Sequence, residues 1–166
     1  MASEQPVASC VEVRVCGYDA APIVHELTRA AFAGHEVLDP PSGTTAETVE
    51  SVRRDLEAAG GALAWLDSRP VGCLRFVVTA DHFHVRRVAV RPELQGRGIG
   101  RALMEWAEAQ AENRGLPRVT VGVRLSLPGN LAFYRRLGYE VVAEHAHPGY
   151  DRPTWVSMQK GVRAPA

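Results

Sequence analysis

The sequence predicts one α/β (α+β) domain over residues 11–160, with its elements in the order β-α-α-β-β-β-α-β-α-β-β. Short runs of β-branched residues between turn residues indicate strands, and longer segments with an apolar stripe at helical spacing indicate helices. A chain of 166 residues also suits a single domain with a sizeable core. Residues 1–10 and 161–166 are expected to be tails.

The expected strands are rich in β-branched residues and are bounded by turn-forming residues. They are residues 11–15, 62–66, 71–79, 81–90, 119–123, 139–144 and 154–158. Alternation in the first strand predicts that Val11, Val13 and Val15 face inward. Residues 67–70 have the composition of a turn, so the second and third strands are expected to pair antiparallel.

The expected helices begin at capping or proline signals and end at glycine. They are residues 22–33, 44–59, 99–114 and 128–137. Thr44 and Glu47 have the spacing of a capping box, which predicts that they open the second helix. The third helix is amphipathic. Its expected buried stripe is Ile99, Leu103, Trp106 and Gln110.

Composition narrows the classes of function. The 19 basic and 19 acidic residues cancel, so no overall field favours nucleic acid or an anionic membrane. Arginine supplies every basic residue except Lys160. The three cysteines, Cys10, Cys16 and Cys73, lack metal or redox spacing and indicate reduced thiols. With neither a signal-peptide pattern nor an apolar run of the roughly 20 residues that span a bilayer, a cytoplasmic protein is expected.

A glycine-punctuated loop at residues 95–101 joins the fourth strand to the third helix. Glycine lets the backbone approach a ligand closely, and the first N–H groups of a helix have no partner within it. Together with the positive end of the helix dipole and the charges of Arg97 and Arg101, these donors suit a phosphate or pyrophosphate. The alternative is an ordinary connection in which the glycines only permit the turn.

Two other phosphate-binding motifs do not fit this loop. A P-loop needs Lys followed by Ser or Thr after its last glycine, where this chain has Arg101 and Ala102. A dinucleotide fingerprint needs the spacing G-x-G-x-x-G, whereas Gly96, Gly98 and Gly100 simply alternate. The spacing therefore argues against a P-loop NTPase and against a dehydrogenase.

Gln95-x-x-Gly98-x-Gly100 resembles the Q/R-x-x-G-x-G/A motif of the GNAT superfamily of acetyl-CoA-dependent N-acetyltransferases. Within residues 132–140, Tyr134 and the Gly138-Tyr139 pair resemble that family's second signature. The resemblance covers residues 11–160 and implies a mixed, mostly antiparallel central sheet of six to seven strands. This sheet is splayed between its fourth and fifth strands and flanked by about four helices. The resemblance also implies acyl transfer from acetyl-CoA (coenzyme A) as co-substrate, without a metal.

The resemblance further implies which residues bind the coenzyme. The loop would cradle the pyrophosphate, and the main chain near Val88 and Val90 would pair with the pantetheine amides like a further strand. A bulge at residues 87–88 would leave an N–H free for the thioester carbonyl. Many members have Asn where this chain has Leu127, so Asn130 is considered in its place. The expected coenzyme-binding residues are Val88, Ala89, Val90, Gln95, Gly96, Arg97, Gly98, Ile99, Gly100, Arg101, Asn130 and Arg135.

Two residues are candidates for proton transfer. Tyr134 stands at the family tyrosine that protonates the leaving thiolate, although an aromatic residue on a core helix is the plain alternative. Ribosomal-protein alanine N-acetyltransferases have a Glu on the fifth strand, which is Gly122 here. Histone-type enzymes place their base eleven residues before the motif glutamine, which is His84 here, and an imidazole suits that role. His84 is otherwise a polar strand residue, and a metal pair with His82 lacks a third ligand.

The acceptor is expected to contact the loop after the first helix and the hairpin loop between the last two strands. The candidate residues are Glu36, Asp39, His147, Tyr150 and Asp151. A solvated loop and a plain turn are the alternatives. The neutral charge favours a small-molecule amine as partner rather than nucleic acid or membrane, and a homodimer is compatible with the sequence. Protein N-terminal acetylation and a non-catalytic acyl-CoA-binding or sensing module are the rival interpretations.

Overall fold

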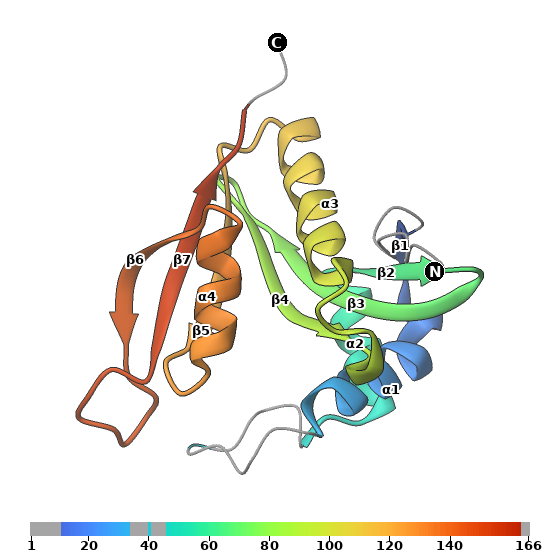
Figure 1. Cartoon of the computed structure of the whole chain (residues 1–166), viewed down its shortest axis with the longest axis horizontal. Coiled ribbons are helices and arrows are strands. Elements are labelled where there is room, and N and C mark those ends of the chain that lie inside the picture. Colours follow the sequence, from blue (N-terminus) through green and yellow to red (C-terminus); the bar gives the residue numbers. More distant parts are fainter. Residues whose placement is uncertain (1–10, 34–39, 41–45, 164–166) are drawn as a thin grey trace, which may run out of the picture. The chain divides into compact units, whose positions relative to one another are not determined.

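The computed structural model describes residues 11–33, 40 and 46–163, in which seven strands and four α-helices follow the expected order (Figure 1). The strands are β1 (Glu12–Cys16), β2 (Gly61–Leu66), β3 (Arg69–Val78), β4 (Phe83–Val90), β5 (Arg118–Arg124), β6 (Glu140–His145) and β7 (Trp155–Gly161). The helices are α1 (Ala21–Phe32), α2 (Val49–Ala58), α3 (Ile99–Asn113) and α4 (Pro128–Arg136). Short 3₁₀ turns at Tyr18–Ala20 and Pro92–Leu94 precede α1 and follow β4.

The strands form one mixed sheet in the order β1-β2-β3-β4-β5-β7-β6. The pairs β1–β2, β2–β3, β5–β7 and β6–β7 are antiparallel. In contrast, β4 and β5 run parallel, and their register joins the first three residues of β4 to β5, from Phe83↔Val119 to Val85↔Val121. The sheet splays between these two strands. This mixed, mostly antiparallel sheet with four helices confirms the fold that the sequence predicts.

The chain folds into two compact units. The described residues up to Val77, together with Arg87–Trp106, form the first unit. Val78–Arg86, together with the described residues from Ala107 onward, form the second. The strand β4 and the helix α3 therefore each contribute residues to both units.

In the first unit, α1 and α2 bury their apolar faces against β2, β3 and the end of β4. The buried residues of this core are Ala21, Val24, Leu27, Ala31, Val52, Leu56, Leu63, Cys73 and Ala89. Val24, Leu27 and Val52 are fully buried, and each such side chain stabilises the fold by about 1.5–3 kcal/mol. Helix α2 begins with a reciprocal cap, in which Ser51 N donates to Thr48 Oγ1 at 3.1 Å and Thr48 N donates to Ser51 Oγ at 2.9 Å.

Gly72 of β3 allows the start of α3 to lie close to the sheet. A Cβ on this glycine would meet the carbonyl oxygen of Ala89 at 2.9 Å and side-chain atoms of Ile99 and Leu103 at 3.2 Å. Real Cβ atoms do not approach backbone oxygen so closely, so a larger residue would push the helix or β4 away. The missing side chain thus helps to fix where α3 begins.

The second unit contains β5, β6, β7, α4 and the end of α3. Tyr139 is 2% exposed, and its ring packs edge-on against that of Tyr134 with centroids 5.7 Å apart. Lys160 of β7 forms an ion pair with Glu108 of α3, and its ammonium lies 5.9 Å from the centroid of the Tyr139 ring. These contacts attach α3 and α4 to the antiparallel strands, which are drawn in orange and red in Figure 1.

Two local predictions are wrong. Val15 is 67% exposed rather than inward, because Cys16, not Val15, packs against the core that α1 covers. The second helix, α2, begins at Val49 rather than at residue 44, and Thr44 of the predicted capping box lies outside the described residues. Thr48 and Ser51 form the observed reciprocal cap, and the Glu47 carboxylate binds arginine side chains.

The buried face of α3 also differs from the predicted stripe. Ile99 and Leu103 are buried as expected, but Trp106 and Gln110 are only half-buried. The positions buried in their place are Met104, Ala107 and Ala111. The small alanine side chains let the helix approach the sheet closely. The half-buried indole of Trp106 lies beside the Phe76 ring, with centroids 5.8 Å apart.

Candidate active site

The loop between β4 and α3 turns at two glycines with left-handed backbones. Gly96 has a φ of 77° and Gly98 a φ of 87°, conformations that a Cβ disfavours. Turns of this kind direct successive N–H groups into a concavity that binds anions. Among the described atoms, none outside the adjoining chain lies within 4 Å of where a Cβ on Gly96 would be. The loop therefore presents its backbone to an open side.

The helix that follows is held firmly at its first residue. Ile99 is 1% exposed, and the Ala102 N–H is the first to bond within the helix, to Gly98 O at 3.0 Å. Gly100 lies inside this first turn, where its backbone needs no left-handed conformation. The N–H groups before Ala102 and the positive end of the helix dipole remain available to an anion.

The polar side chains of the loop lie at its surface. Gln95 and Arg97 are exposed, and Gln95 Nε2 donates to the carbonyl of Val90 at 3.2 Å, which ties the loop to the end of β4. Arg101 is exposed and forms an ion pair with Glu105 at 3.2 Å. The structure thus brings residues 95–101 together around one helix start.

A left-handed residue interrupts β4 before its last three residues. Arg87 has a φ of 56°, at the place where the resemblance predicts a bulge. Beyond it, Ala89 is buried, whereas Val88 and Val90 are half-buried. Arginine gains nothing from this conformation by itself, so the surrounding structure must maintain it.

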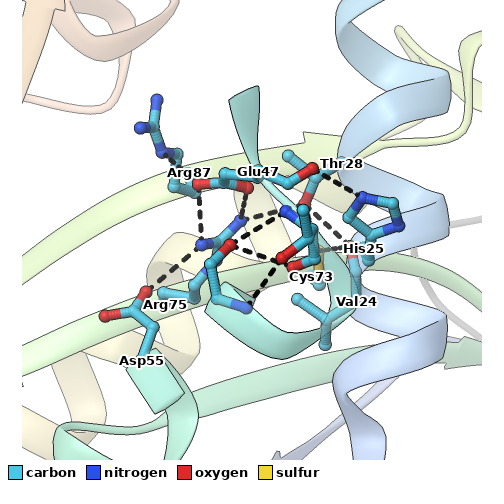
Figure 2. A network of polar contacts seen from close by, with 10 residues as sticks. Val24, His25, Thr28, Glu47, Asp55, Cys73, Arg75 and Arg87 are labelled. Carbon is cyan, nitrogen blue, oxygen red and sulfur yellow. Dashed lines mark hydrogen bonds and ion pairs between the residues drawn. The ribbon is translucent and has the colours of Figure 1, made fainter. Parts of the chain in front are cut away.

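The side chain of Arg87 belongs to a cluster of charged residues, shown in Figure 2. Arg75 of β3 is 3% exposed and binds both oxygens of Glu47, with Nη1–Oε1 at 3.0 Å and Nη2–Oε2 at 2.7 Å. Its Nη1 also donates to Asp55 of α2 at 3.2 Å. Arg87 Nε completes the cluster by approaching Glu47 Oε1 at 3.2 Å. Two cations and two anions therefore share one largely buried site.

The charges of this cluster set its ionisation. Burial alone would raise the pKa of Glu47, but the hydrogen bonds and charges of Arg75, followed by the charge of Arg87, hold that pKa below its ordinary value. The carboxylate is therefore ionised at neutral pH. This cluster was not predicted from the sequence. The signal that could have revealed the cluster is Arg75, a single charge within the apolar strand of residues 71–79. Buried charges are normally paired, so a charge at this position implies an oppositely charged partner.

Tyr134 is a buried residue of α4. Its ring packs edge-on against Phe133 at 5.0 Å and Tyr139 at 5.7 Å between centroids. Burial raises the pKa of the Tyr134 phenol, so the hydroxyl keeps its proton at neutral pH. The other two coenzyme candidates of this helix, Asn130 and Arg135, are exposed.

His84 is half-buried on β4, opposite Thr120 of β5 in the parallel register. Its Nδ1 lies 2.8 Å from Thr120 Oγ1, which holds one ring nitrogen in place. Burial, followed by the charges of His82 and Arg86, lowers the pKa of His84 below its ordinary value. Its imidazole is therefore neutral at pH 7, the form that accepts a proton. His82 has a different environment, because its ring binds Asp81 at 2.7 Å.

The hairpin loop between β6 and β7 gathers two of the predicted acceptor residues. His147 Nδ1 lies 2.5 Å from Thr154 Oγ1, and the His147 ring packs edge-on against Tyr150 with centroids 6.4 Å apart. The ring centroid of Trp155, a residue not predicted from the sequence, lies 6.5 Å from that of His147. Asp151 is exposed. The two remaining acceptor candidates, Glu36 and Asp39, lie outside the described residues.

Metal-binding clusters and membrane-spanning helices are both absent from the described part of the chain. No three His, Cys, Asp or Glu side chains there gather in a way that would hold a metal ion. None of the helices there is both long and apolar enough to cross a membrane.

Residues 24–139 match the Acetyltransferase (GNAT) family. The match covers more than half of the chain and contains both the loop at residues 95–101 and Tyr134. The chain therefore belongs to this family.

Similar proteins agree with this assignment. The ribosomal protein bS18-alanine N-acetyltransferase of Escherichia coli K12 is 36% identical over 62 residues, which cover 37% of this chain and 42% of that protein. The crystal structure of the ribosomal-protein-S18-alanine N-acetyltransferase from Escherichia coli has a TM-score of 0.74 and 19% identity, covering 94% of this chain and 96% of that one. A GNAT family acetyltransferase from Elizabethkingia anophelis with acetyl-CoA bound has a TM-score of 0.69 and 17% identity, covering 93% and 99%. The chain spans 25% and 42% of the first two curated relatives it matches.

Proposed function

We propose that the protein is an N-acetyltransferase that moves the acetyl group of acetyl-CoA to a primary amine. The observation that carries this proposal is the loop with left-handed Gly96 and Gly98 at the start of α3, in a chain that belongs to the GNAT family. The structure from Elizabethkingia anophelis with acetyl-CoA bound supports the choice of co-substrate.

The loop supplies what a pyrophosphate requires. Its N–H groups and the dipole of α3 attract negative charge without a side chain, and Arg97 and Arg101 add positive charge beside them. The main chain of Val88 and Val90 pairs with the amides of the pantetheine arm in the manner of an added strand. These roles need the backbone conformation of the loop and of β4 more than any one side chain.

The reaction is a direct transfer in a ternary complex. The amine nitrogen attacks the thioester carbonyl carbon, and an N–H next to Arg87 stabilises the negative charge that forms on the oxygen. The C–S bond then breaks, and its electron pair leaves with the sulfur. Because the Tyr134 phenol keeps its proton, it donates a hydrogen bond that stabilises the developing thiolate as the sulfur leaves, and the thiolate then takes a proton from solvent.

His84 takes the proton that the amine loses. Its lowered pKa keeps the imidazole neutral, and in the tautomer whose Nδ1–H donates to Thr120 Oγ1 the other nitrogen, Nε2, accepts the proton. The lowered pKa of His84 predicts how activity depends on pH. Activity should fall only below the ordinary histidine pKa of about 6.5, when the imidazole becomes protonated.

A small-molecule amine is the acceptor class that we favour. The chain carries no net charge that would attract a long charged partner. The ring centroids of Tyr150 and Trp155 lie 6.4 and 6.5 Å from that of His147, and aromatic ring faces suit an organic cation. The N-terminal amine of a protein is the second candidate, because one relative is a ribosomal protein bS18-alanine N-acetyltransferase. The glycine at residue 122, where such enzymes have Glu, weakens that candidate.

Free thiol release from acetyl-CoA, measured across small amines and short peptides, tests the proposal. Tyr134→Phe and His84→Gln should each reduce turnover by about 10²–10⁴-fold, the usual contribution of an acid or a base. Tyr139→Phe and His82→Gln are matched controls and should retain turnover. Tight coenzyme A binding without turnover of any amine would favour the sensing-module interpretation. Mass spectrometry of peptide products would identify the protein N-terminal alternative.

A further inference from the structure

Arg87 has a backbone conformation that a side chain disfavours, in the strand proposed to face the thioester. Its φ of 56° lies in the left-handed region, where glycine is at home and arginine is not. A single residue of this kind redirects the peptide groups that follow it in a strand. The direction of the N–H groups near Val88 therefore depends on what keeps Arg87 in this conformation.

The Arg87 side chain is held from one side by Glu47. Their atoms Nε and Oε1 are 3.2 Å apart, and the Glu47 side chain is 14% exposed. The Arg87 side chain is 32% exposed, so the pair is partly buried, and salt screens it less than a fully exposed pair. Glu47 is therefore a suitable anchor for the conformation of Arg87, provided that Glu47 itself cannot move.

Several elements of the first unit fix Glu47. Arg75 of β3 binds both carboxylate oxygens, and His25 of α1 contacts the Glu47 backbone carbonyl through Nε2 at 3.0 Å. The next residue, Thr48, caps α2. Figure 2 shows the carboxylate between the two arginines, with His25 on the opposite side of the residue. The anchor is thus tied to two helices and a strand.

We propose that Glu47 is a positioning residue for acetyl transfer, which holds Arg87 left-handed and so directs the following N–H of β4 toward the thioester carbonyl. This role rests on the proposed function. Glu47 touches no reacting atom in it and acts only through Arg87. Because its arginine partners hold the pKa of Glu47 below its ordinary value, the carboxylate is a weak base, and His84 remains the proton acceptor of the proposed reaction.

The thioester carbonyl itself reports the direction of the N–H. Infrared spectroscopy of bound acetyl-CoA, labelled with ¹³C at this carbonyl, should show a lower stretching frequency with the native protein than in solution. Glu47→Gln should lose most of that shift. Removing an oxyanion donor outright costs about 10²–10³ in kcat, so a misdirected donor should cost about tenfold, with the Kd for coenzyme A unchanged. Glu12→Gln, which breaks the exposed pair with Arg14, is the matched control and should change neither quantity.

Two variants of Arg87 separate conformation from charge. Arg87→Gly and Arg87→Ala both remove the ion pair, but only glycine adopts the left-handed conformation readily. The glycine variant should therefore keep more of the carbonyl shift and of kcat than the alanine variant. This comparison also decides the matter if Glu47→Gln fails to fold.

Specific results would overturn the proposal. It is wrong if Glu47→Gln retains both the carbonyl shift and kcat, or if the two Arg87 variants behave alike. If the native protein does not bind acetyl-CoA, the proposed function itself fails. If it binds acetyl-CoA with no shift that depends on Glu47, only the positioning role fails.

Discussion

Replacing Arg75 with methionine should lower the free energy of unfolding by about 3 kcal/mol, because it leaves two partly buried carboxylates without their principal partner. Methionine keeps most of the apolar volume, so the loss reports the charged head group rather than a cavity. In the native protein the guanidinium binds Glu47 and Asp55, and its Nη2 lies 3.4 Å from Thr28 Oγ1.

For Arg75→Met, the surroundings of the two carboxylates indicate a loss of unfolding free energy at the lower end of the range for broken buried ion pairs. Removing one partner of a buried ion pair costs roughly 3–5 kcal/mol. Glu47 keeps its contact with Arg87 at 3.2 Å, and Asp55 is 21% exposed, so water compensates for part of the loss. Against a total stability of about 5–15 kcal/mol, such a loss is still large. For a chain of this size it corresponds to a fall in Tm of roughly 6–12 °C.

Urea unfolding followed by tryptophan fluorescence and circular dichroism measures this difference. Arg69→Met is the matched control, because Arg69 begins the same strand but forms an exposed pair with Glu93. We expect no measurable change in its midpoint. The reasoning is refuted if Arg75→Met unfolds at the native midpoint, or if the two variants are equally destabilised.

Three further results are expected. Gly72→Ala should destabilise the protein by about 1–3 kcal/mol in urea unfolding, since its Cβ would strike the β4 backbone, whereas Gly129→Ala in open space should not destabilise it. The pKa of Glu47 is held below its ordinary value of 4.5, so its contribution to stability should be complete above that pH and lost as the pH falls below it. When unfolding midpoints are measured between pH 3 and 7, the difference between the native protein and Glu47→Gln should therefore shrink toward pH 3. Tyr139→Phe should be neutral or stabilising in thermal unfolding, because the buried Tyr139 hydroxyl has no partner among the described residues, and a loss as large as that of a core cavity would contradict this.

The element order and the glycine turn at residues 95–101 could be predicted because local signals determine them. Glycine is needed at residues 96 and 98 by the backbone itself, and the observed φ values are left-handed at both. The strands were recognisable from β-branched alternation, and the helices from their caps and terminal glycines. Errors arose where two local signals were equivalent. Thr48-x-x-Ser51 has the same spacing as Thr44-x-x-Glu47, and only the structure shows which pair caps α2.

The charged cluster could not be predicted in this way because its members are distant in sequence. Glu47 and Arg75 are separated by 28 residues, and their contact depends on how α2 packs against β3. Nor does any local pattern indicate that Arg87 is left-handed, since arginine has no preference for that conformation. The family resemblance indicated an irregularity at residues 87–88. It gave no indication of the side chain that holds it.

Lys160 is the only lysine of the sequence, and its ammonium is bound to Glu108, whose side chain is 13% exposed. Thioesters acylate free amines slowly without any enzyme, whereas the guanidinium of arginine stays protonated and does not act as a nucleophile. Under the proposed function, this composition leaves Lys160 as the one lysine amine that acetyl-CoA could modify. The proposed partners of the coenzyme phosphates, Arg97 and Arg101, are guanidinium groups that do not react in this way.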